Sequence, residues 1–391
     1  MDPDFSALDA YLTDEGVDGY LIEADGEDSD QRYLSGFDAP DSFVTLYTPE
    51  TTALLVSGLE YGRAKTESRA DEVDRYGDFA YRQKIEDHGP AVAKAMVLAE
   101  FLADHDVESV VVPSEFPVAT ADGLRERDVE VRPETEGVVT RIRATKTDEE
   151  IEYVREAQRA NEAAMAAAET LIEDATVEDG VLHHDGDPLT AERVKEQIEL
   201  TLLRNGCALD ETIVACGEHG ADPHDRGSGP LEADELIVID IFPRDKASKY
   251  HADMTRTFLK GEPTPEQERR YDITATAVEA AFDAIEPGAT GADVHDAVCD
   301  VYEDAGFATL RSDERAETGF IHSTGHGVGL DVHELPKVSP DGGELEPGHV
   351  ITIEPGLYDP EVGGVRIEDL LVVTEDGFEN LTDYPKALVL D

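Results

Sequence analysis

Acidic side chains interrupt the apolar, strand-like runs in the second half of this sequence. Asp240 closes the run LIVID, Asp253 lies in YHADMTRTF, Glu354 follows HVITI, and Glu368 lies within GGVRIEDLLVV. Glutamate is a poor strand residue, and a buried carboxylate without a partner is costly. If the fold brings these four acids together, their repulsion amounts to several kcal/mol per pair unless cations lie among them. Two divalent ions would balance the four charges, whereas a lone aspartate at a strand end is more often a turn or cap residue.

A glycine-rich segment further along the chain, HSTGHGVGLDVHE, carries His322, His326 and His333. Glycine allows backbone and ligands to approach closely. Neutral imidazole is the commonest transition-metal ligand, and histidine is the side chain that titrates nearest neutrality. The segment therefore indicates a metal or acid–base site. From these residues alone, a glycine-rich loop with exposed histidines remains the alternative.

The charge balance excludes one class of partner. The 391 residues include 90 Asp and Glu against 32 Lys and Arg, a net charge of −58, so a nucleic-acid backbone would repel the protein. The acids are spread along the chain, and only 10 of the basic residues are lysines. We interpret this pattern as the hydrated surface of a halophilic protein, the alternative being an acidic surface that binds other proteins.

Neither export nor a membrane partner is expected. Cys207, Cys216 and Cys299 form no C-x-x-C motif, which argues against a disulfide framework or a thiolate zinc site and fits a reducing interior. The N-terminus carries acids where a signal peptide needs a basic and then an apolar segment, and no run of 18 apolar residues occurs. We therefore expect a cytoplasmic protein.

The hydrophobic pattern divides the chain near residue 140. Before that point, apolar runs typical of strands occur at 19–24, 42–47, 52–56 and 109–112, with a helical stretch at 91–102. This half concentrates no metal-binding or nucleophilic residues. It is expected to be a small α/β domain with a structural and oligomerisation role.

The remaining chain begins with a helix-rich segment. Thr147 and Glu150 have the spacing of a capping box, which predicts the start of a long helix. Further helices are expected at 191–204, 265–285 and 292–305, between strand-like segments.

These motifs resemble those of the pita-bread metallopeptidases, which include Xaa-Pro dipeptidase, aminopeptidase P, methionine aminopeptidase and creatinase, and the resemblance covers essentially the whole chain. It implies an α+β fold, with a pita-bread catalytic domain at 141–391 behind a smaller creatinase-type α/β domain at 1–140. The family's ligand order, Asp-Asp-His-Glu-Glu, implies two metal ions held by Asp240, Asp253, His326, Glu354 and Glu368. Asp253 and Glu368 would bridge the metals, Asp240 would complete one, and His326 with Glu354 the other.

The resemblance also implies roles for neighbouring residues. His224, in ADPHDRG, would contact the substrate, and His333 would donate a hydrogen bond to the substrate carbonyl and the tetrahedral intermediate. His322, Arg366 and Tyr358 match substrate-pocket positions. Arg366 would pair with a substrate carboxylate or with an acid of the pocket. The alternatives without a functional role are that His224 is a surface-loop residue and that Arg366 forms a purely structural ion pair.

One segment departs from the family pattern. Asp240 and Asp253 are 13 positions apart, two more than is usual, and Phe242 and Pro243 stand beside Asp240 where a glycine is usual. An insertion of two residues preserves strand parity, so both aspartates can still point to one face of a longer hairpin. The departure therefore concerns the shape of the pocket beside Asp240.

The ligand set favours Mn²⁺ or Co²⁺, because it is rich in oxygen and has one imidazole. A hydroxide bridging two such ions would attack the scissile carbonyl, while Glu354 shuttles the proton to the leaving nitrogen. We expect hydrolysis of X-Pro bonds in dipeptides, with aminopeptidase P activity on longer X-Pro peptides as the alternative. A non-peptide lyase or a catalytically silent binding protein would use the same fold. The N-terminal domain of the family implies a homodimer.

Overall fold

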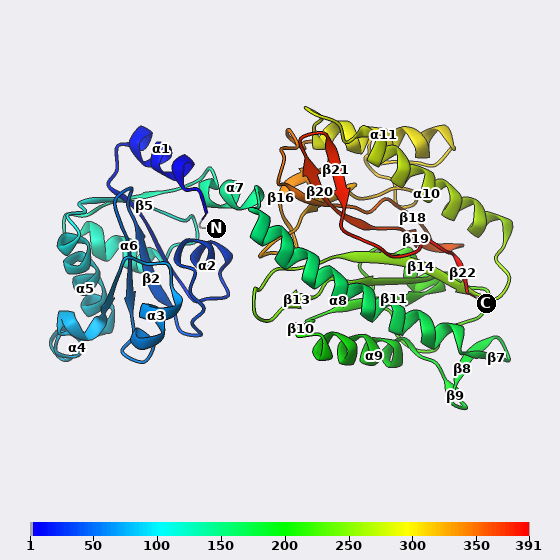
Figure 1. Cartoon of the computed structure of the whole chain (residues 1–391), viewed down its shortest axis with the longest axis horizontal. Coiled ribbons are helices and arrows are strands. Elements are labelled where there is room, and N and C mark those ends of the chain that lie inside the picture. Colours follow the sequence, from blue (N-terminus) through cyan, green and yellow to red (C-terminus); the bar gives the residue numbers. More distant parts are fainter. Residues whose placement is uncertain (1–2, 391) are drawn as a thin grey trace. The chain divides into compact units, whose positions relative to one another are not determined.

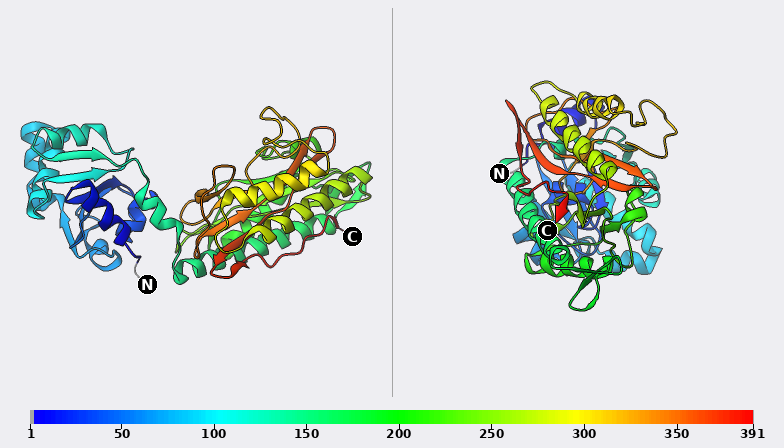
Figure 2. Two further views of the ribbon diagram at one scale, coloured as in Figure 1. Left: turned by 90° about the horizontal axis from the view of Figure 1, so that it is seen from above. Right: turned by 90° about the vertical axis from the view of Figure 1, so that its right-hand side faces the viewer.

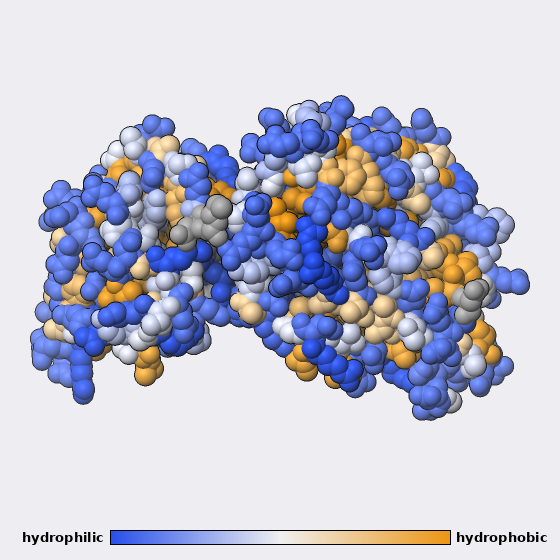
Figure 3. All heavy atoms as spheres, viewed as in Figure 1, coloured by the Kyte–Doolittle hydropathy of each residue, from blue (hydrophilic) through white to orange (hydrophobic). Residues whose placement is uncertain are grey.

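The computed structural model describes residues 3–390, and along the chain one compact unit ends at Arg143 and a second begins at Ala144 (Figure 1). The division lies near the end of helix α7 (Val138–Ala144), whereas the sequence placed it before residue 141. Among the described helices, none combines the length and apolar character needed to cross a membrane. The face in view in Figure 3 is mainly hydrophilic, in keeping with the net charge of −58.

The first unit is built on a six-stranded mixed sheet in the order β4-β3-β2-β1-β5-β6. The central pairs β1–β2 and β2–β3 are antiparallel, and the outer pairs are parallel. The strands are β1 (Gly19–Ala24), β2 (Phe43–Tyr47), β3 (Thr52–Val56), β4 (Glu72–Arg75), β5 (Ser109–Val112) and β6 (Glu130–Pro133). The strands expected from the apolar runs are therefore present, because each run supplies side chains to a sheet that is buried on its inner strands.

Helices cover this sheet. They are α1 (Ser6–Glu15), α2 (Ser29–Ser35), α3 (Tyr61–Glu67), α4 (Tyr81–His88), α5 (Pro90–Asp104) and α6 (Val118–Arg125). Helix α5 extends beyond the expected 91–102 at both ends, and Pro90 occupies its first turn, where the missing N–H is not needed. Leu98 and Phe101 of α5 pack with Leu21 and Val110 of the sheet in one core.

The two largest sheets of the second unit have four and five strands. The first has the order β11-β12-β14-β22, with β11 (Thr212–Cys216), β12 (Ile237–Ile241), β14 (Met254–Lys260) and β22 (Val389–Leu390). The second has the order β16-β15-β17-β20-β21, with β15 (Gly325–Gly327), β16 (Glu334–Val338), β17 (Val350–Ile353), β20 (Asp369–Thr374) and β21 (Gly377–Asn380). The unit also contains two short strand pairs, β18 (Gly356–Asp359) with β19 (Gly363–Arg366) and β10 (Cys207–Ala208) with β13 (Arg244–Asp245). A three-stranded ribbon consists of β7 (Thr176–Glu178), β8 (Val181–His184) and β9 (Asp187–Pro188).

Two pairs of helices pack against these sheets. Helices α8 (Asp148–Glu173) and α9 (Ala191–Arg204) share a core with the four-stranded sheet, and α10 (Pro265–Ala284) and α11 (Gly291–Asp304) share one with the five-stranded sheet. Figure 1 and Figure 2 show α10 and α11 side by side, with strands between them and α9. The capping box predicted at the start of α8 is confirmed: Thr147 accepts from the Glu150 amide, and the Glu150 carboxylate accepts from the Thr147 amide.

The strands place the acidic residues differently from the sequence prediction at two points. Asp240 does not end its strand, because β12 continues to Ile241 and Asp240 pairs with Thr255 of β14. Glu368 does not lie inside a strand, because it falls between β19 and β20, where the chain passes from one strand pair to another and the Glu368 amide donates to the Thr255 carbonyl. Asp253 directly precedes β14, and alternation puts it on the same face as Thr255 and Asp240, as parity requires.

Candidate metal centre

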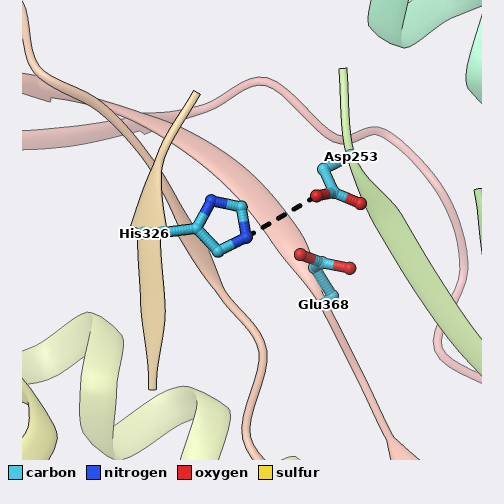
Figure 4. A group of neighbouring side chains, drawn as sticks. All are labelled: Asp253, His326 and Glu368. Atoms are coloured by element: carbon cyan, nitrogen blue, oxygen red, sulfur yellow. Dashed lines mark ion pairs between the residues drawn. The ribbon is translucent and has the colours of Figure 1, made fainter. Parts of the chain in front are cut away.

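Three possible ligands converge in the second unit, as Figure 4 shows. Asp253 precedes β14, His326 lies in β15, and Glu368 lies between β19 and β20. Each offers one ligand atom, and these atoms all lie within 4.8 Å of one another. The His326 Nε2 atom is 3.7 Å from Asp253 Oδ2. Among the described residues, these three form the one group of His, Cys, Asp or Glu side chains whose ligand atoms are spaced closely enough to hold a metal ion.

Glu354 and Asp240 lie beside this group and have partners of their own. Glu354 Oε1 is 3.3 Å from His326 Nε2, and it accepts a hydrogen bond of 3.2 Å from the Thr352 hydroxyl. Asp240 Oδ2 accepts from Arg366 Nη2 at 2.6 Å. The four acids and the histidine named from the sequence thus occupy one region, with Asp240 turned toward an arginine.

A cavity of about 970 Å³ surrounds the group. It is lined by nine of the ten side chains singled out from the sequence: His224, Asp240, Asp253, His322, His326, His333, Glu354, Arg366 and Glu368. The tenth, Tyr358, is fully buried and does not line the cavity. A space of this size is at the upper end for a small-molecule site.

Tyr358 connects two residues of the cavity wall. Arg366 Nη1 donates to Tyr358 Oη at 2.9 Å, and Tyr358 Oη lies 2.9 Å from His322 Nε2. The other ring nitrogen of His322 lies 2.7 Å from the Ser323 carbonyl, which can only accept. Nδ1 therefore carries the proton, Nε2 accepts from the tyrosine, and the ring is neutral. Burial agrees, because it lowers the pKa of His322 to about 4.

The carboxylates of the centre differ in their preferred charge. Burial, reinforced by the charges of neighbouring acids, raises the pKa of Asp253 and of Glu368 well above its usual range. Burial also opposes the charge of Glu354, but the hydrogen bond and charge of His326 outweigh it and lower the pKa of Glu354 to about 2. The protein alone therefore does not supply enough positive charge to keep every acid of the centre ionised.

The residues fit divalent cations. Asp240 Oδ1 is buried and has no hydrogen-bond partner within residues 3–390. The Nδ1 atom of His326 lies 3.1 Å from the Gly327 carbonyl, to which it donates, so Nε2 is the ring atom that faces the acids and would bind a cation after losing its proton. An oxygen-rich donor set with one imidazole suits divalent metal ions.

The two remaining histidines lie at different depths. The ring of His333 stands at 89° to that of His326, with centroids 4.3 Å apart, and burial followed by the charge of His326 lowers the pKa of His333. His224 is exposed on the loop after the short helix at 217–221 and lines the cavity mouth.

Two threonines in contact with the centre were not identified from the sequence. Thr352 accepts from the His326 amide and donates to Glu354, and Thr255 donates to Glu368 Oε2 at 2.8 Å. Each lies two residues from a predicted ligand on the same strand face. Strand parity around Asp253 and Glu354 was the available signal, but threonine is so common in strands that its presence alone indicates nothing.

Two known protein families match this chain. Residues 152–375 match the model of metallopeptidase family M24, and residues 5–145 match that of the creatinase/prolidase N-terminal domain. With the carboxylate–histidine centre, these matches define a two-domain metal-dependent peptidase whose catalytic unit has the pita-bread fold, as the motifs implied. The chain belongs to metallopeptidase family M24.

Named relatives span nearly the whole chain. The Xaa-Pro dipeptidase of Pyrococcus furiosus is 31% identical over 351 residues, which cover 88% of this chain and 86% of that protein. The solved prolidase of Pyrococcus horikoshii has a TM-score of 0.78 and 28% identity, with 98% of both chains covered. The X-Pro aminopeptidase of Thermotoga maritima also has a TM-score of 0.78, with 26% identity, and covers 96% of this chain and 98% of that one.

Proposed function

We propose that this protein is an Xaa-Pro dipeptidase that works with two divalent cations, Mn²⁺ or Co²⁺. The convergence of Asp253, His326 and Glu368 within 4.8 Å, inside a cavity, carries the proposal. The likeness to proteins named Xaa-Pro dipeptidase and prolidase supports the substrate class.

Asp240, Asp253, His326, Glu354 and Glu368 would hold the cations. Their combined negative charge is what such ions offset, and Asp240 Oδ1 has a free position for one. When bound, the cations would supply Lewis-acid polarisation of the scissile carbonyl and activation of a water molecule.

The protein's own side chains would position the substrate and move the proton. Glu354 is ionised, and the Thr352 hydroxyl fixes one of its oxygens, so it is suited to take a proton at its other oxygen and return it to the leaving nitrogen. His333, facing the cavity beside His326, would donate to the substrate carbonyl. His224 would contact the substrate at the mouth. Arg366 and His322 form part of the cavity wall, and Tyr358, buried behind them, holds both side chains.

An X-Pro bond suits a dedicated enzyme, because its nitrogen has no N–H for a general peptidase to bind. The second candidate is an aminopeptidase that cleaves longer X-Pro peptides. The size of the cavity favours it, as does the likeness to the Thermotoga maritima enzyme.

The deciding experiment uses purified protein with MnCl₂ or CoCl₂ in concentrated KCl. Ala-Pro and Gly-Pro test the dipeptidase, Ala-Pro-Ala tests the aminopeptidase, and Ala-Ala is the control without proline. We expect cleavage of the two X-Pro dipeptides. Cleavage of the tripeptide alone would move the activity to the second candidate, and no cleavage of any X-Pro substrate would refute the peptidase proposal. Glu368→Ala is expected to lose metal binding and activity together.

We further propose a cytoplasmic, halophilic homodimer. The acidic composition supports the salt adaptation, and the creatinase-type N-terminal unit supports the dimer. Light scattering coupled to size-exclusion chromatography in molar KCl tests the oligomeric state, for which a mass of one chain would contradict the dimer.

A further inference from the structure

Thr255 lies between three charged groups of the metal centre. Its side chain is fully buried, and its hydroxyl donates to Glu368 Oε2 at 2.8 Å. The Thr255 hydroxyl oxygen also accepts a hydrogen bond from Arg366 Nε at 3.1 Å. Arg366 in turn donates to Asp240 through Nη2 at 2.6 Å. One hydroxyl thus connects two acids proposed to hold cations.

The chemistry of the partners fixes the direction of each hydrogen bond. The Nε of an arginine can only donate, so the threonine oxygen must accept from it. The single hydroxyl proton is then left for Glu368, whose carboxylate oxygen can accept it. The hydroxyl cannot rotate to another acceptor without losing this arrangement.

Backbone contacts reinforce the same connection. The Glu368 amide donates to the Thr255 carbonyl at 3.0 Å, although Glu368 lies outside any strand. Thr255 is also the register partner of Asp240 across β12 and β14. The residue therefore holds both the backbone and the side chain of Glu368 against the strand pair that carries Asp240.

We propose that Thr255 is a positioning residue of the metal centre. It holds Glu368, and through Arg366 also Asp240, in the arrangement that the cations need. The inference rests on the proposed function, because it takes both acids as metal ligands. Without the hydroxyl, the flexible Glu368 side chain is free to turn away from Asp253, whose charge repels it. Metal binding would then have to restore the order that Thr255 now provides.

Thr257 offers a matched control on the same strand. It is equally buried and lies two residues further along, on the same face. Its hydroxyl accepts from the Arg366 amide at 2.9 Å and donates to the Arg366 carbonyl at 2.9 Å. Thr257 therefore bonds only to backbone atoms through these hydrogen bonds, whereas the Thr255 hydroxyl bonds to a carboxylate. Replacing either threonine by valine removes one buried hydroxyl of similar surroundings.

The test is calorimetric titration of chelator-treated protein with MnCl₂, for wild type, Thr255→Val, Thr257→Val and Thr255→Ser. We expect Thr255→Val to weaken Mn²⁺ binding by about 10- to 100-fold. Thr257→Val is expected to stay within about threefold of wild type, and Thr255→Ser, which keeps the hydroxyl, to stay within a similar factor. If Thr255→Val does not fold, Thr255→Ala and Thr257→Ala make the same comparison.

Equal Mn²⁺ affinity in Thr255→Val and Thr257→Val would overturn the inference, as would a failure of Thr255→Ser to restore binding. Neither result affects the proposed function, for which the wild-type titration and the cleavage of Ala-Pro are the evidence. Conversely, wild-type protein that binds Mn²⁺ without cleaving Ala-Pro would refute the dipeptidase and leave the role of Thr255 open to the same titration.

Discussion

Arg366 and Asp240 form a buried ion pair, with Arg366 Nη2 2.6 Å from Asp240 Oδ2 and 4% of Arg366 exposed. Of the two partners considered for this arginine from the sequence, the geometry favours an acid of the pocket. The arginine engages one oxygen of Asp240 and leaves the other without a partner within residues 3–390. The pair thus offsets part of the negative charge of the centre and leaves one oxygen of Asp240 available for a cation, as proposed above.

Removing this arginine should destabilise the metal-free protein. Arg366→Met leaves Asp240 buried without its cation, and breaking a buried ion pair costs about 3–5 kcal/mol. The free energy of unfolding, measured by chemical denaturation in the presence of EDTA, should fall by that amount. Lys337→Ala is the control, because Lys337 pairs with Asp341 on the surface, with side chains 58% and 72% exposed, and should cost no more than about 1 kcal/mol. Equal losses in the two variants would contradict the account of Arg366.

The stability of the protein should fall between pH 6.5 and 4 because of His349. Burial, together with the charge of Lys146, lowers the pKa of His349 to about 4. In the unfolded chain the pKa of the ring is near 6.5, so between pH 6.5 and 4 the unfolded state binds more protons than the native state. Lowering the pH therefore stabilises the unfolded state relative to the native state. The resulting loss in the free energy of unfolding is absent above pH 6.5 and amounts to about 2–3 kcal/mol at pH 4.5.

His349→Asn isolates this contribution, because its side-chain oxygen can replace Nδ1 as acceptor for the Glu346 amide without titrating. Denaturation curves at pH 7 and pH 4.5 should show a smaller loss in the variant than in wild type. The same loss in both proteins would mean that His349 is not the group responsible.

Phe242 should restrict the size of the residue that precedes proline. Its side chain lines both the main cavity and a neighbouring cavity of about 190 Å³, and Val332 and Glu211 line both as well. Phe242→Ala would join the two spaces. In an X-Pro dipeptide only the first residue varies, so we expect kcat/KM for Phe-Pro relative to Ala-Pro to rise about tenfold. Phe242→Leu should give an intermediate ratio, and an unchanged ratio in both variants would show that the ring does not set this specificity.

Salt should stabilise the protein strongly. With a net charge of −58, repulsion among surface acids opposes folding, and molar salt shortens the screening length to about 3 Å. The melting temperature should rise by about 10 °C or more between 0.1 M and 2 M KCl. Equal melting temperatures would refute the halophilic interpretation and leave the peptidase proposal untouched.

Much of the fold was predictable because local signals agreed with the tertiary structure. Apolar runs became strands, and the capping box at Thr147 started α8 as expected. The face shared by Asp240 and Asp253 followed from strand parity, since an even insertion leaves alternation unchanged.

The contacts that orient the site were not predictable, because they join distant segments. Glu368 reaches Thr255 across 113 residues, and Arg366 reaches Asp240 across 126. Strand patterns do not say where a chain leaves one sheet for another, so Glu368 was placed inside a strand instead of between two. Tyr358 was named as a pocket residue, yet only the structure shows that it lies behind the wall and holds His322 and Arg366.

The presence of two cations among these acids is tested most directly by anomalous diffraction from crystals soaked in MnCl₂. We predict two anomalous peaks inside the cavity, bounded by Asp240, Asp253, His326, Glu354 and Glu368. Crystals that show no manganese there, although the same preparation cleaves Ala-Pro when supplied with Mn²⁺, would contradict the assignment of the metal centre.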